Sequence, residues 1–261
     1  MKKSIKALAS LGFGLVFLLT YTATSAQTDT TVTASKDKSP VFAPHKITYK
    51  SYLLPAALIG VGTTATIIRV HQNDYKNVAL NTTKKEPSIF MQPENYTAFA
   101  PAAAVFALNL AGVHGKHTPA EQVLLYAVSA GLTSAIVYPL KGTTKVLRPD
   151  NTDFQSFPSS HAAIAFASAE FLRREYGDQS AWYTVAGYAA ATTTAIIRVA
   201  KDEHWVADVC AGAGIGIAST TTTYWIYNKI KAHSKNKKSS NALLMPAVAP
   251  NFYGVYLAKS F

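Results

Sequence analysis

The stretch "RVAKDEHWVAD" at residues 198–208 holds every charged residue of a region that runs from Ser180 to Asn228. Long uncharged segments lie on both sides of it. Charged side chains are rarely buried without a partner, so a charged stretch between two apolar segments calls for an explanation. If a helix begins near His204, the spacing of four residues puts His204 and Asp208 on one face. The carboxylate can then orient the imidazole, as in a catalytic triad.

Uncharged segments recur along the chain and predict an all-α fold with six main helices. Five stretches lack Asp, Glu, Lys and Arg, and each approaches the roughly 20 residues that cross a bilayer as a helix. A sixth, 159–177, begins with Ser159 as a helix N-cap and stops at Gly177. Their many Ala, Gly and Thr residues suit close packing in a membrane or in a water-soluble bundle. The five uncharged stretches are 51–68, 96–115, 122–140, 180–197 and 209–228.

Four regions are expected along the chain. Residues 1–26 combine three early lysines, an apolar run and small residues before the expected cleavage point, which is typical of a secretory signal peptide. Residues 27–50 are rich in Thr, Ser and Lys and predict a flexible linker. The helical domain is expected over 51–240. The tail 241–261 contains Pro and Gly between apolar and aromatic residues, which indicates a short β-hairpin.

Charge and cysteine content limit the functional classes. The net charge is +11, yet the basic residues form no aromatic-interleaved patch, so we expect no nucleic-acid partner. Phosphates and anionic lipids are better partners for an exported basic protein. Cys210 is the only cysteine, which excludes an intrachain disulfide. The basic runs 172–177 and 228–238 would face the cytoplasm by the positive-inside rule, in conflict with a cleaved signal peptide and six full spans.

Three short blocks carry the candidate chemistry: "KGTTKVLRP" from Lys141, "FPSSH" ending at His161, and the opening stretch. Each lies at the edge of an apolar helix. Lys141, Arg148 and Arg198 supply cations that suit phosphate oxygens. The start of the helix after Ser159 adds backbone N–H donors. A held imidazole can attack phosphorus, and His161 can protonate a leaving alkoxide. Taken singly, each of these residues also fits an ordinary structural role.

Together the blocks read K-x6-RP, PSxH and R-x5-H-x3-D, in this order, between Lys141 and Asp208. The pattern resembles the three-part signature of the type 2 phosphatidic acid phosphatase and vanadium haloperoxidase superfamily. The resemblance implies an all-helical bundle and a phosphatase that needs no metal and no cofactor. It implies a phosphohistidine on His204, oriented by Asp208, with His161 as acid and base. The implied phosphate-binding residues are Lys141, Arg148, Ser159, Ser160 and Arg198.

Two positions depart from that signature. Ser160 stands where the second motif usually has Gly, but its N–H can still point at an anion. Ile197 stands where the third motif usually has Ser, which removes one hydroxyl near the phosphate and puts the rate in doubt more than the reaction. The intervening loop residues Lys201, Asp202 and Glu203 are expected to be solvated and not catalytic.

Several functions remain open from the sequence. The first is a metal-independent phosphatase for a lipid phosphomonoester or pyrophosphate, associated with the cell-envelope membrane and with its site facing the periplasm. The second is a soluble periplasmic acid phosphatase of broad specificity. A vanadium haloperoxidase and an inactive anion-binding protein are less favoured. The expected partner is a phosphorylated lipid or a small phosphomonoester, and no obligate protein partner is evident.

Overall fold

The computed structural model describes residues 47–73, 78–83, 92–236, 242–249 and 252–259. The predicted signal peptide, and the predicted linker up to residue 46, lie outside the described residues. The chain forms two compact units that divide between Thr223 and Tyr224.

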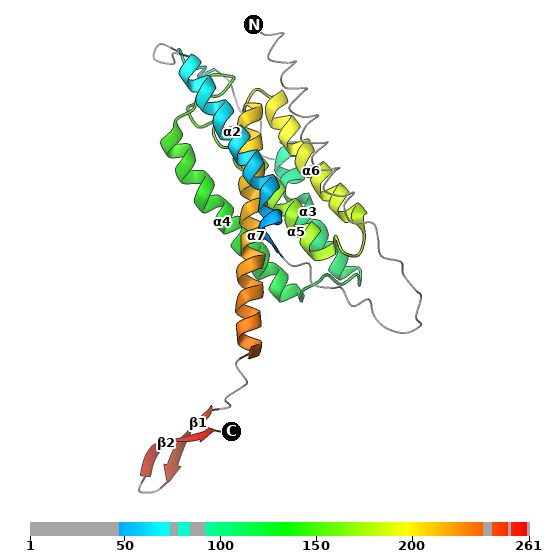
Figure 1. Cartoon of the computed structure of the whole chain (residues 1–261), viewed down its shortest axis with the longest axis vertical. Coiled ribbons are helices and arrows are strands. Elements are labelled where there is room, and N and C mark those ends of the chain that lie inside the picture. The colour runs from blue at the N-terminus through cyan, green and yellow to red at the C-terminus, as the bar shows by residue number, and fades with distance from the viewer. Residues whose placement is uncertain (1–46, 74–77, 84–91, 237–241, 250–251, 260–261) are drawn as a thin grey trace. The chain divides into compact units, whose positions relative to one another are not determined.

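The predicted all-α fold is confirmed, and six α-helices are present in the described part of the chain (Figure 1). A short 3-10 helix, η2, precedes them. The helix bounds differ from those of the predicted stretches by a few residues: α2, for example, ends four residues beyond its uncharged stretch, and α3 ends five residues before the end of its own. Their bounds are η2 Tyr49–Tyr52, α2 Leu53–Gln72, α3 Pro93–Leu110, α4 Pro119–Thr144, α5 Ser160–Tyr176, α6 Ala181–Ala200 and α7 Val206–Asn236.

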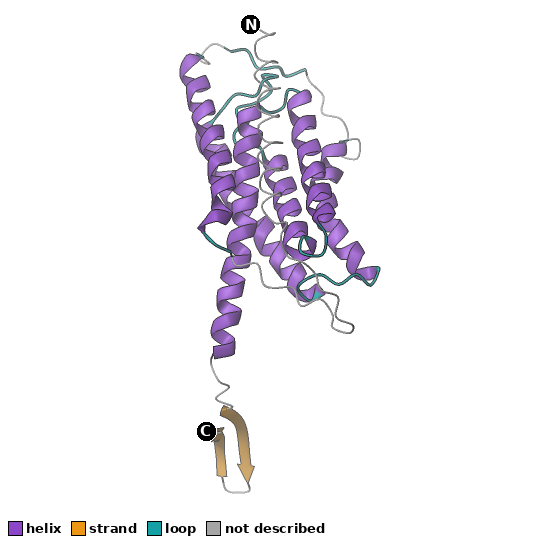
Figure 2. Ribbon diagram, turned by 45° about the vertical axis from the view of Figure 1, so that its right-hand side comes forward, coloured by secondary structure: helices purple, strands orange, loops and turns teal. Residues whose placement is uncertain are grey.

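Figure 2 shows the helices lying side by side, and contacts between their ends show that successive helices run in opposite directions. An ion pair joins Arg69, near the end of α2, to Asp208, at the start of α7. A second joins Arg198, near the end of α6, to Glu94, at the start of α3. Thr144, at the end of α4, donates its hydroxyl to the backbone oxygen of Phe157, just before α5, and the N–H of Ser159 donates to the backbone oxygen of Asp208. The ends of α2, α4 and α6 therefore meet the starts of α3, α5 and α7. This arrangement gathers six helix termini at one end of the bundle.

Helix α5 is the central helix of the first unit and packs against α3, α4 and α6 (Figure 1). Most of its residues are buried, and many are alanines. A Cβ on Gly212 would lie 2.4 Å from the carbonyl oxygen of Ser159, and one on Gly216 would lie 2.1 Å from that of Ala163. Both glycines are on α7, so the lack of a side chain lets α7 approach the backbone of α5.

Helix starts follow the capping rules. Ser159 is the N-cap of α5, as predicted, and its hydroxyl oxygen accepts the N–H of Ala162 at 3.5 Å. Thr118 and Glu121 form a capping box at α4, with Pro119 as the first helical residue. Local sequence therefore determines where α4 and α5 begin, and with them the positions of two of the predicted motifs.

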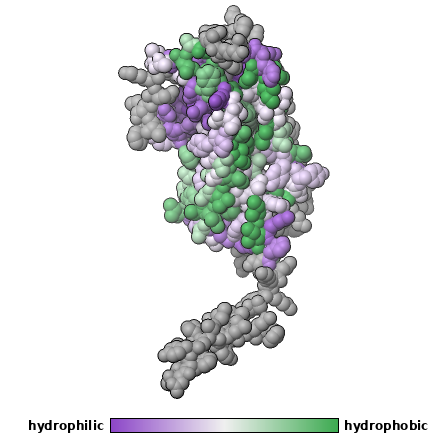
Figure 3. All heavy atoms as spheres, turned by 90° about the vertical axis from the view of Figure 1, so that its left-hand side faces the viewer, coloured by the Kyte–Doolittle hydropathy of each residue, from purple (hydrophilic) through white to green (hydrophobic). Residues whose placement is uncertain are grey.

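The helices α2 and α4 present large apolar side chains to the outside. Together with η2, α2 forms a 24-residue apolar helix, and α4 has 26 residues; only 22% of the most apolar window of each is buried. Both are long and apolar enough to cross a membrane. Figure 3 shows hydrophobic areas along this flank. The exposed apolar side chains include Leu53, Val61, Ile67, Ile68, Val123, Leu124, Val128, Ile136 and Tyr138.

The second unit contains the predicted C-terminal strand pair. Strand β1, Ala242–Ala249, pairs antiparallel with β2, Phe252–Lys259. The register aligns Ala242 with Lys259 and Ala249 with Phe252. The tail is thus a two-stranded hairpin appended to an all-helical fold.

Candidate active site

The site lies at the end of the bundle where the six helix termini meet. Arg69, Lys141 and Arg198 stand in the last turns of α2, α4 and α6. Glu94 and Asp208 stand in the first turns of α3 and α7. Cations are favoured at helix C-termini and anions at N-termini, so each charge has the sign that its helix dipole stabilises. The alternating helix directions therefore bring opposite charges together without opposing any dipole.

His204 lies in the loop between α6 and α7 and is almost fully buried. Its Nδ1 is 2.8 Å from the backbone oxygen of Ser156, whereas the nearer carboxylate oxygen of Asp208 is 3.8 Å away. The sequence predicted that Asp208 orients His204; the direct hydrogen-bond acceptor of Nδ1 is the carbonyl of Ser156. A carbonyl oxygen only accepts, so Nδ1 carries the proton and Nε2 keeps its lone pair. Burial lowers the pKa of His204 to about 4, which favours this neutral form.

Asp208 is fully buried and is held from three sides. Its Oδ2 accepts the hydroxyl of Ser156 and the N–H of Trp205. Its Oδ1 accepts from Arg69, whose guanidinium lies 4.4 Å from the centre of the Trp205 ring. Burial alone would raise the pKa of Asp208, but the neighbouring His204, Arg69 and Ser156 hold it below its ordinary value. Asp208 is thus a fixed anion that orients the loop carrying His204.

The three predicted phosphate-binding cations come from three segments: the end of α4, the loop that follows it, and the end of α6. Lys141 is buried, and its ammonium donates to the backbone oxygen of Gln155 at 2.5 Å. Arg148 donates through Nε to Asp153 at 2.9 Å. Arg198 donates through Nη1 to Glu94 at 3.1 Å. Burial is the largest cause that lowers the pKa of His204, and the charges of Lys141 and Arg198 lower it further.

Glu203 overturns one prediction from the sequence. Its side chain is only 4% exposed, so it is not a solvated loop residue. One oxygen, Oε2, pairs with Nη2 of Arg198 and lies 3.9 Å from Nη1 of Arg148. The prediction failed because the partners of Glu203 are distant in sequence or on the preceding helix. Lys201 is also paired, with Glu94 at 2.6 Å.

His161 stands in the first turn of α5, and its Nε2 is 2.8 Å from Oδ1 of Asn95. An amide oxygen only accepts, so Nε2 carries the proton and Nδ1 is the basic nitrogen. Burial is the main reason that the pKa of His161 falls to about 3, with the charges of Arg198 and His204 next. His161 is therefore neutral in the unliganded site, and a bound anion would raise its pKa.

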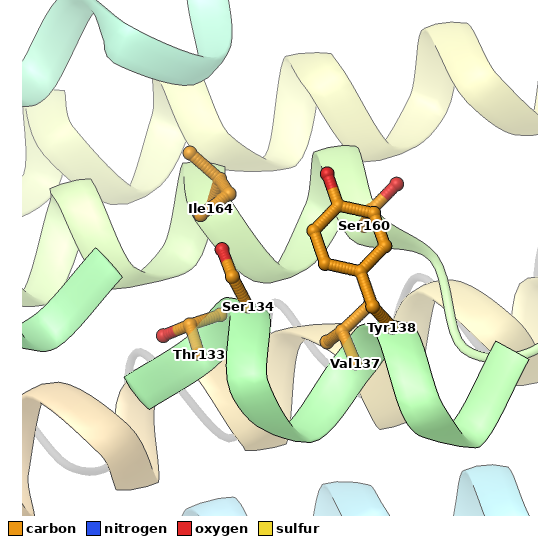
Figure 4. A pocket seen from close by; sticks show the side chains of 6 residues that line it. All are labelled: Thr133, Ser134, Val137, Tyr138, Ser160 and Ile164. Atoms are coloured by element: carbon orange, nitrogen blue, oxygen red, sulfur yellow. The ribbon is translucent and has the colours of Figure 1, made fainter. Parts of the chain in front are cut away.

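The remaining predicted residues are at the start of α5. Ser159 is fully buried, and its N–H donates to the backbone oxygen of Asp208 at 3.0 Å. Ser160 borders a small pocket between α4 and α5, which Figure 4 shows with Tyr138 and Ile164 at its edge. The cavity volume is about 10 Å³, which is room for about one water molecule. A phosphate or a lipid chain does not fit there without movement of the side chains.

Buried polar atoms without a hydrogen-bond partner gather at this end of the bundle. Within the described part of the chain, seven buried side-chain atoms have no such partner, and four belong to the site. An unpaired buried polar group costs about 1–3 kcal/mol, so these atoms are available to a polar ligand. The four are Arg69 Nε, Glu94 Oε2, His161 Nδ1 and Arg198 Nε.

Five site residues escaped the sequence analysis: Arg69, Glu94, Asn95, Ser156 and Glu203. Arg69 and Glu94 look like ordinary helix-end charges that match the dipole. Ser156 acts partly through its backbone carbonyl, which has no sequence signature. The sequence offered one signal, for Glu94 and Asn95. In the stretch "PEN" both follow directly after Pro93, and a proline often occupies the first position of a helix.

Comparison with known proteins finds a family that part of the chain resembles. Residues 122–232 match the family model described as the PAP2 superfamily, and all three motifs lie inside this segment.

Two particular proteins resemble it. The lipid A 1-phosphatase of Porphyromonas gingivalis is 36% identical over 138 residues, which is 52% of this chain and 31% of that protein. The chain therefore matches only about a third of the length of this relative. The solved structure of a transmembrane PAP2-type phosphatidylglycerolphosphate phosphatase from Bacillus subtilis has a TM-score of 0.40 and 19% identity. Its alignment covers 73% of this chain and 98% of that one.

Proposed function

We propose that the chain is a phosphatase that hydrolyses a phosphomonoester or pyrophosphate on a lipid through a phosphohistidine at His204. The observation that carries the proposal is the 2.8 Å contact between His204 Nδ1 and the Ser156 carbonyl. That contact fixes the tautomer with a lone pair on Nε2, the form an attacking imidazole requires. The pKa of about 4 keeps this form populated at neutral pH.

In the first step, the phosphate binds among Lys141, Arg148 and Arg198, and His204 Nε2 attacks phosphorus. The N–P bond forms as the P–O bond to the lipid breaks. Developing charge on the equatorial oxygens is stabilised by the fixed cations. His161 gives a proton to the leaving oxygen, because the bound phosphate raises its pKa above the unliganded value of about 3.

In the second step, water attacks the phosphohistidine and the N–P bond breaks. His161 now takes the proton of the water and is protonated again, and it gives this proton to solvent when the product phosphate leaves. Nδ1 is the nitrogen of His161 suited to this transfer, because its Nε2 is bonded to Asn95 and its Nδ1 has no hydrogen-bond partner. The proton that His161 takes from solvent when substrate binds is thus returned to solvent when phosphate leaves, and no step uses a metal ion.

A lipid substrate is supported by the surface of the bundle. Helices α2 and α4 are long, apolar and mostly unburied, so they suit contact with a bilayer. The site lies at the ends of these helices, where phosphorylated headgroups are found in a membrane. The name of the Porphyromonas gingivalis relative places a lipid A 1-phosphate among the substrates to examine. We further propose that the protein is exported, with this end facing the periplasm.

The testing experiment is phosphate release by the purified chain in detergent with EDTA. The substrates are lipid A 1-phosphate, phosphatidate, an isoprenyl pyrophosphate and p-nitrophenyl phosphate. We expect the lipids to be preferred, and rapid acid quenching to trap an acid-labile phosphoprotein. Faster turnover of p-nitrophenyl phosphate, with the protein recovered in a salt-washed soluble fraction, would instead support a soluble acid phosphatase.

The matched control is His204→Asn, which keeps a nitrogen near the Nδ1 position and removes Nε2. We expect it to bind phosphate and to release none. Activity in this variant at the wild-type level would overturn the phosphohistidine. Activity that EDTA abolishes and zinc restores would overturn metal independence while leaving the phosphatase reaction intact.

A further inference from the structure

Glu203 occupies a position that the proposed reaction gives to the substrate. A single oxygen, Oε2, contacts Arg198 and lies 3.9 Å from Arg148, although these residues are 50 positions apart in the sequence. Both guanidinium groups were assigned to the phosphate. An anion that bridges them must therefore take the place of this carboxylate.

Glu203 is not needed to hold either guanidinium in place. Arg148 already donates through Nε to Asp153, and Arg198 already donates through Nη1 to Glu94. Glu203 is the carboxylate that the two share. Burying a carboxylate costs free energy, and the two guanidinium groups offset this cost. They do so only while no anion of higher charge occupies the space between them. Glu203 directly precedes His204 in the sequence, so the residue that bridges the two arginines is adjacent to the residue proposed to attack phosphorus.

We propose that Glu203 is a tethered anion that fills the phosphate position of the unliganded site and rotates away when substrate binds. The inference rests on the proposed phosphate role of Arg148 and Arg198. A phosphomonoester at neutral pH has nearly two negative charges and three acceptor oxygens, against one charge and two oxygens for a carboxylate. A phosphodiester has a single charge. Glu203 is thus a specificity-determining residue that admits phosphomonoester dianions and disfavours monoanions.

The test measures binding rather than turnover. Glu203→Gln keeps the shape of the side chain and removes its charge. Inorganic phosphate is titrated calorimetrically into the full chain in detergent with EDTA, and we expect the variant to bind at least about tenfold more tightly. Equal or weaker binding of phosphate by a folded Glu203→Gln protein would overturn the inference. It would mean that the carboxylate only holds the arginines in position for phosphate and does not compete with it.

Asp153→Asn is the matched control. It makes the same change in net charge beside Arg148, but the Asp153 carboxylate pairs with Arg148 through Nε and also accepts the backbone N–H of Gln155, and it does not bridge two arginines. We expect its gain in phosphate affinity to be several-fold smaller. Equal gains in the two variants would mean that general electrostatics, and not occupancy by Glu203, limits binding. If Glu203→Gln does not fold, Glu203→Asp tests the same point, since the shorter carboxylate reaches the arginines less well and phosphate should again bind more tightly.

Selectivity is measured with methyl phosphate and dimethyl phosphate, which differ by one charge. The wild-type protein should prefer methyl phosphate, and Glu203→Gln should narrow this preference at least about threefold. An unchanged ratio would overturn the role in specificity. Failure of wild type and both Glu203 variants to bind phosphate, in folded form, would overturn the proposed phosphate site itself. Normal phosphate binding and turnover with no gain in the variants would overturn the role of Glu203 alone.

Discussion

Asn95 Oδ1 lies 2.8 Å from Nε2 of His161, so a residue at the start of α3 fixes the tautomer of a histidine at the start of α5. Neither Asn95 nor its helix belongs to the segment that matches the superfamily model. The proton-transfer group of the proposed reaction is therefore positioned from outside the motifs. Asn95 is a positioning residue, because it acts through His161.

Replacing Asn95 with Asp should move the pH profile of turnover. The added carboxylate faces an imidazole that is also near Arg198, His204, Glu94 and Lys141, and an adjacent negative charge raises the pKa of a histidine. The alkaline limb of kcat should shift upward, since His161 stays protonated to higher pH. Asn95→Ala should lower kcat without that shift. A profile that is identical in all three proteins would contradict the positioning role.

Arg69 should affect catalysis without affecting phosphate binding. It pairs with Asp208 at 3.3 Å, and its loss leaves the buried carboxylate less well held. Hydrogen bonds to charged groups contribute about 1.5–3 kcal/mol, so we expect Arg69→Gln to lower kcat roughly tenfold to a hundredfold. KM should change little.

Arg148→Gln is the comparison for Arg69→Gln, because Arg148 is assigned to the phosphate. This variant should mainly raise KM and weaken the binding of inorganic phosphate. If Arg69→Gln weakens phosphate binding as strongly as Arg148→Gln does, Arg69 contacts the substrate and its assigned role is wrong.

Stability should fall as the pH drops from about 6.5 to about 4. The pKa of His204 is lowered from 6.5 to about 4 in the folded chain, mainly by burial, so the unfolded chain binds the proton more readily. The contribution of neutral His204 to the free energy of unfolding is complete above pH 6.5. It decreases by roughly 3 kcal/mol as the pH falls toward and below 4. The melting temperature of His204→Asn should therefore change less with pH across this range than that of the wild-type protein. Parallel curves for the two proteins would refute the prediction.

Gly216→Ala should destabilise the bundle. The new Cβ would meet the carbonyl oxygen of Ala163 at 2.1 Å, which forces α7 away from α5. Overpacking of this kind costs about 1–3 kcal/mol and lowers the melting temperature. Gly142→Ala on α4 is the control, because no atom lies within 4 Å of its Cβ position. The control should be neutral or up to about 1 kcal/mol stabilising, as expected for Ala in a helix.

The sequence allowed prediction of the helices because an uncharged segment near 20 residues long has few other stable structures. It also allowed prediction of the eight motif residues, since their spacing is distinctive. It did not reveal that the Ser156 carbonyl, and not Asp208, accepts the His204 proton, because every residue has a carbonyl. Nor did it reveal the burial of Glu203. Charged loop residues are usually solvated. Glu203 is buried because it packs against Arg148 and Arg198, which the fold brings to it from a loop and from a helix end.

The alternation of helix directions leaves the opposite end of the bundle with none of the assigned residues. The connections that join α3 to α4 and α5 to α6 lie there, and they contain residues such as His117 and Asp178. In a bilayer, those two connections would face one compartment and the chemistry the other. With a single native cysteine, Cys210, that is only partly exposed, cysteines introduced at Asn151 and at Asp178 could be labelled separately by an impermeant reagent on intact cells. Labelling of one cysteine and not the other would show which end of the bundle faces outward, without any assay of activity.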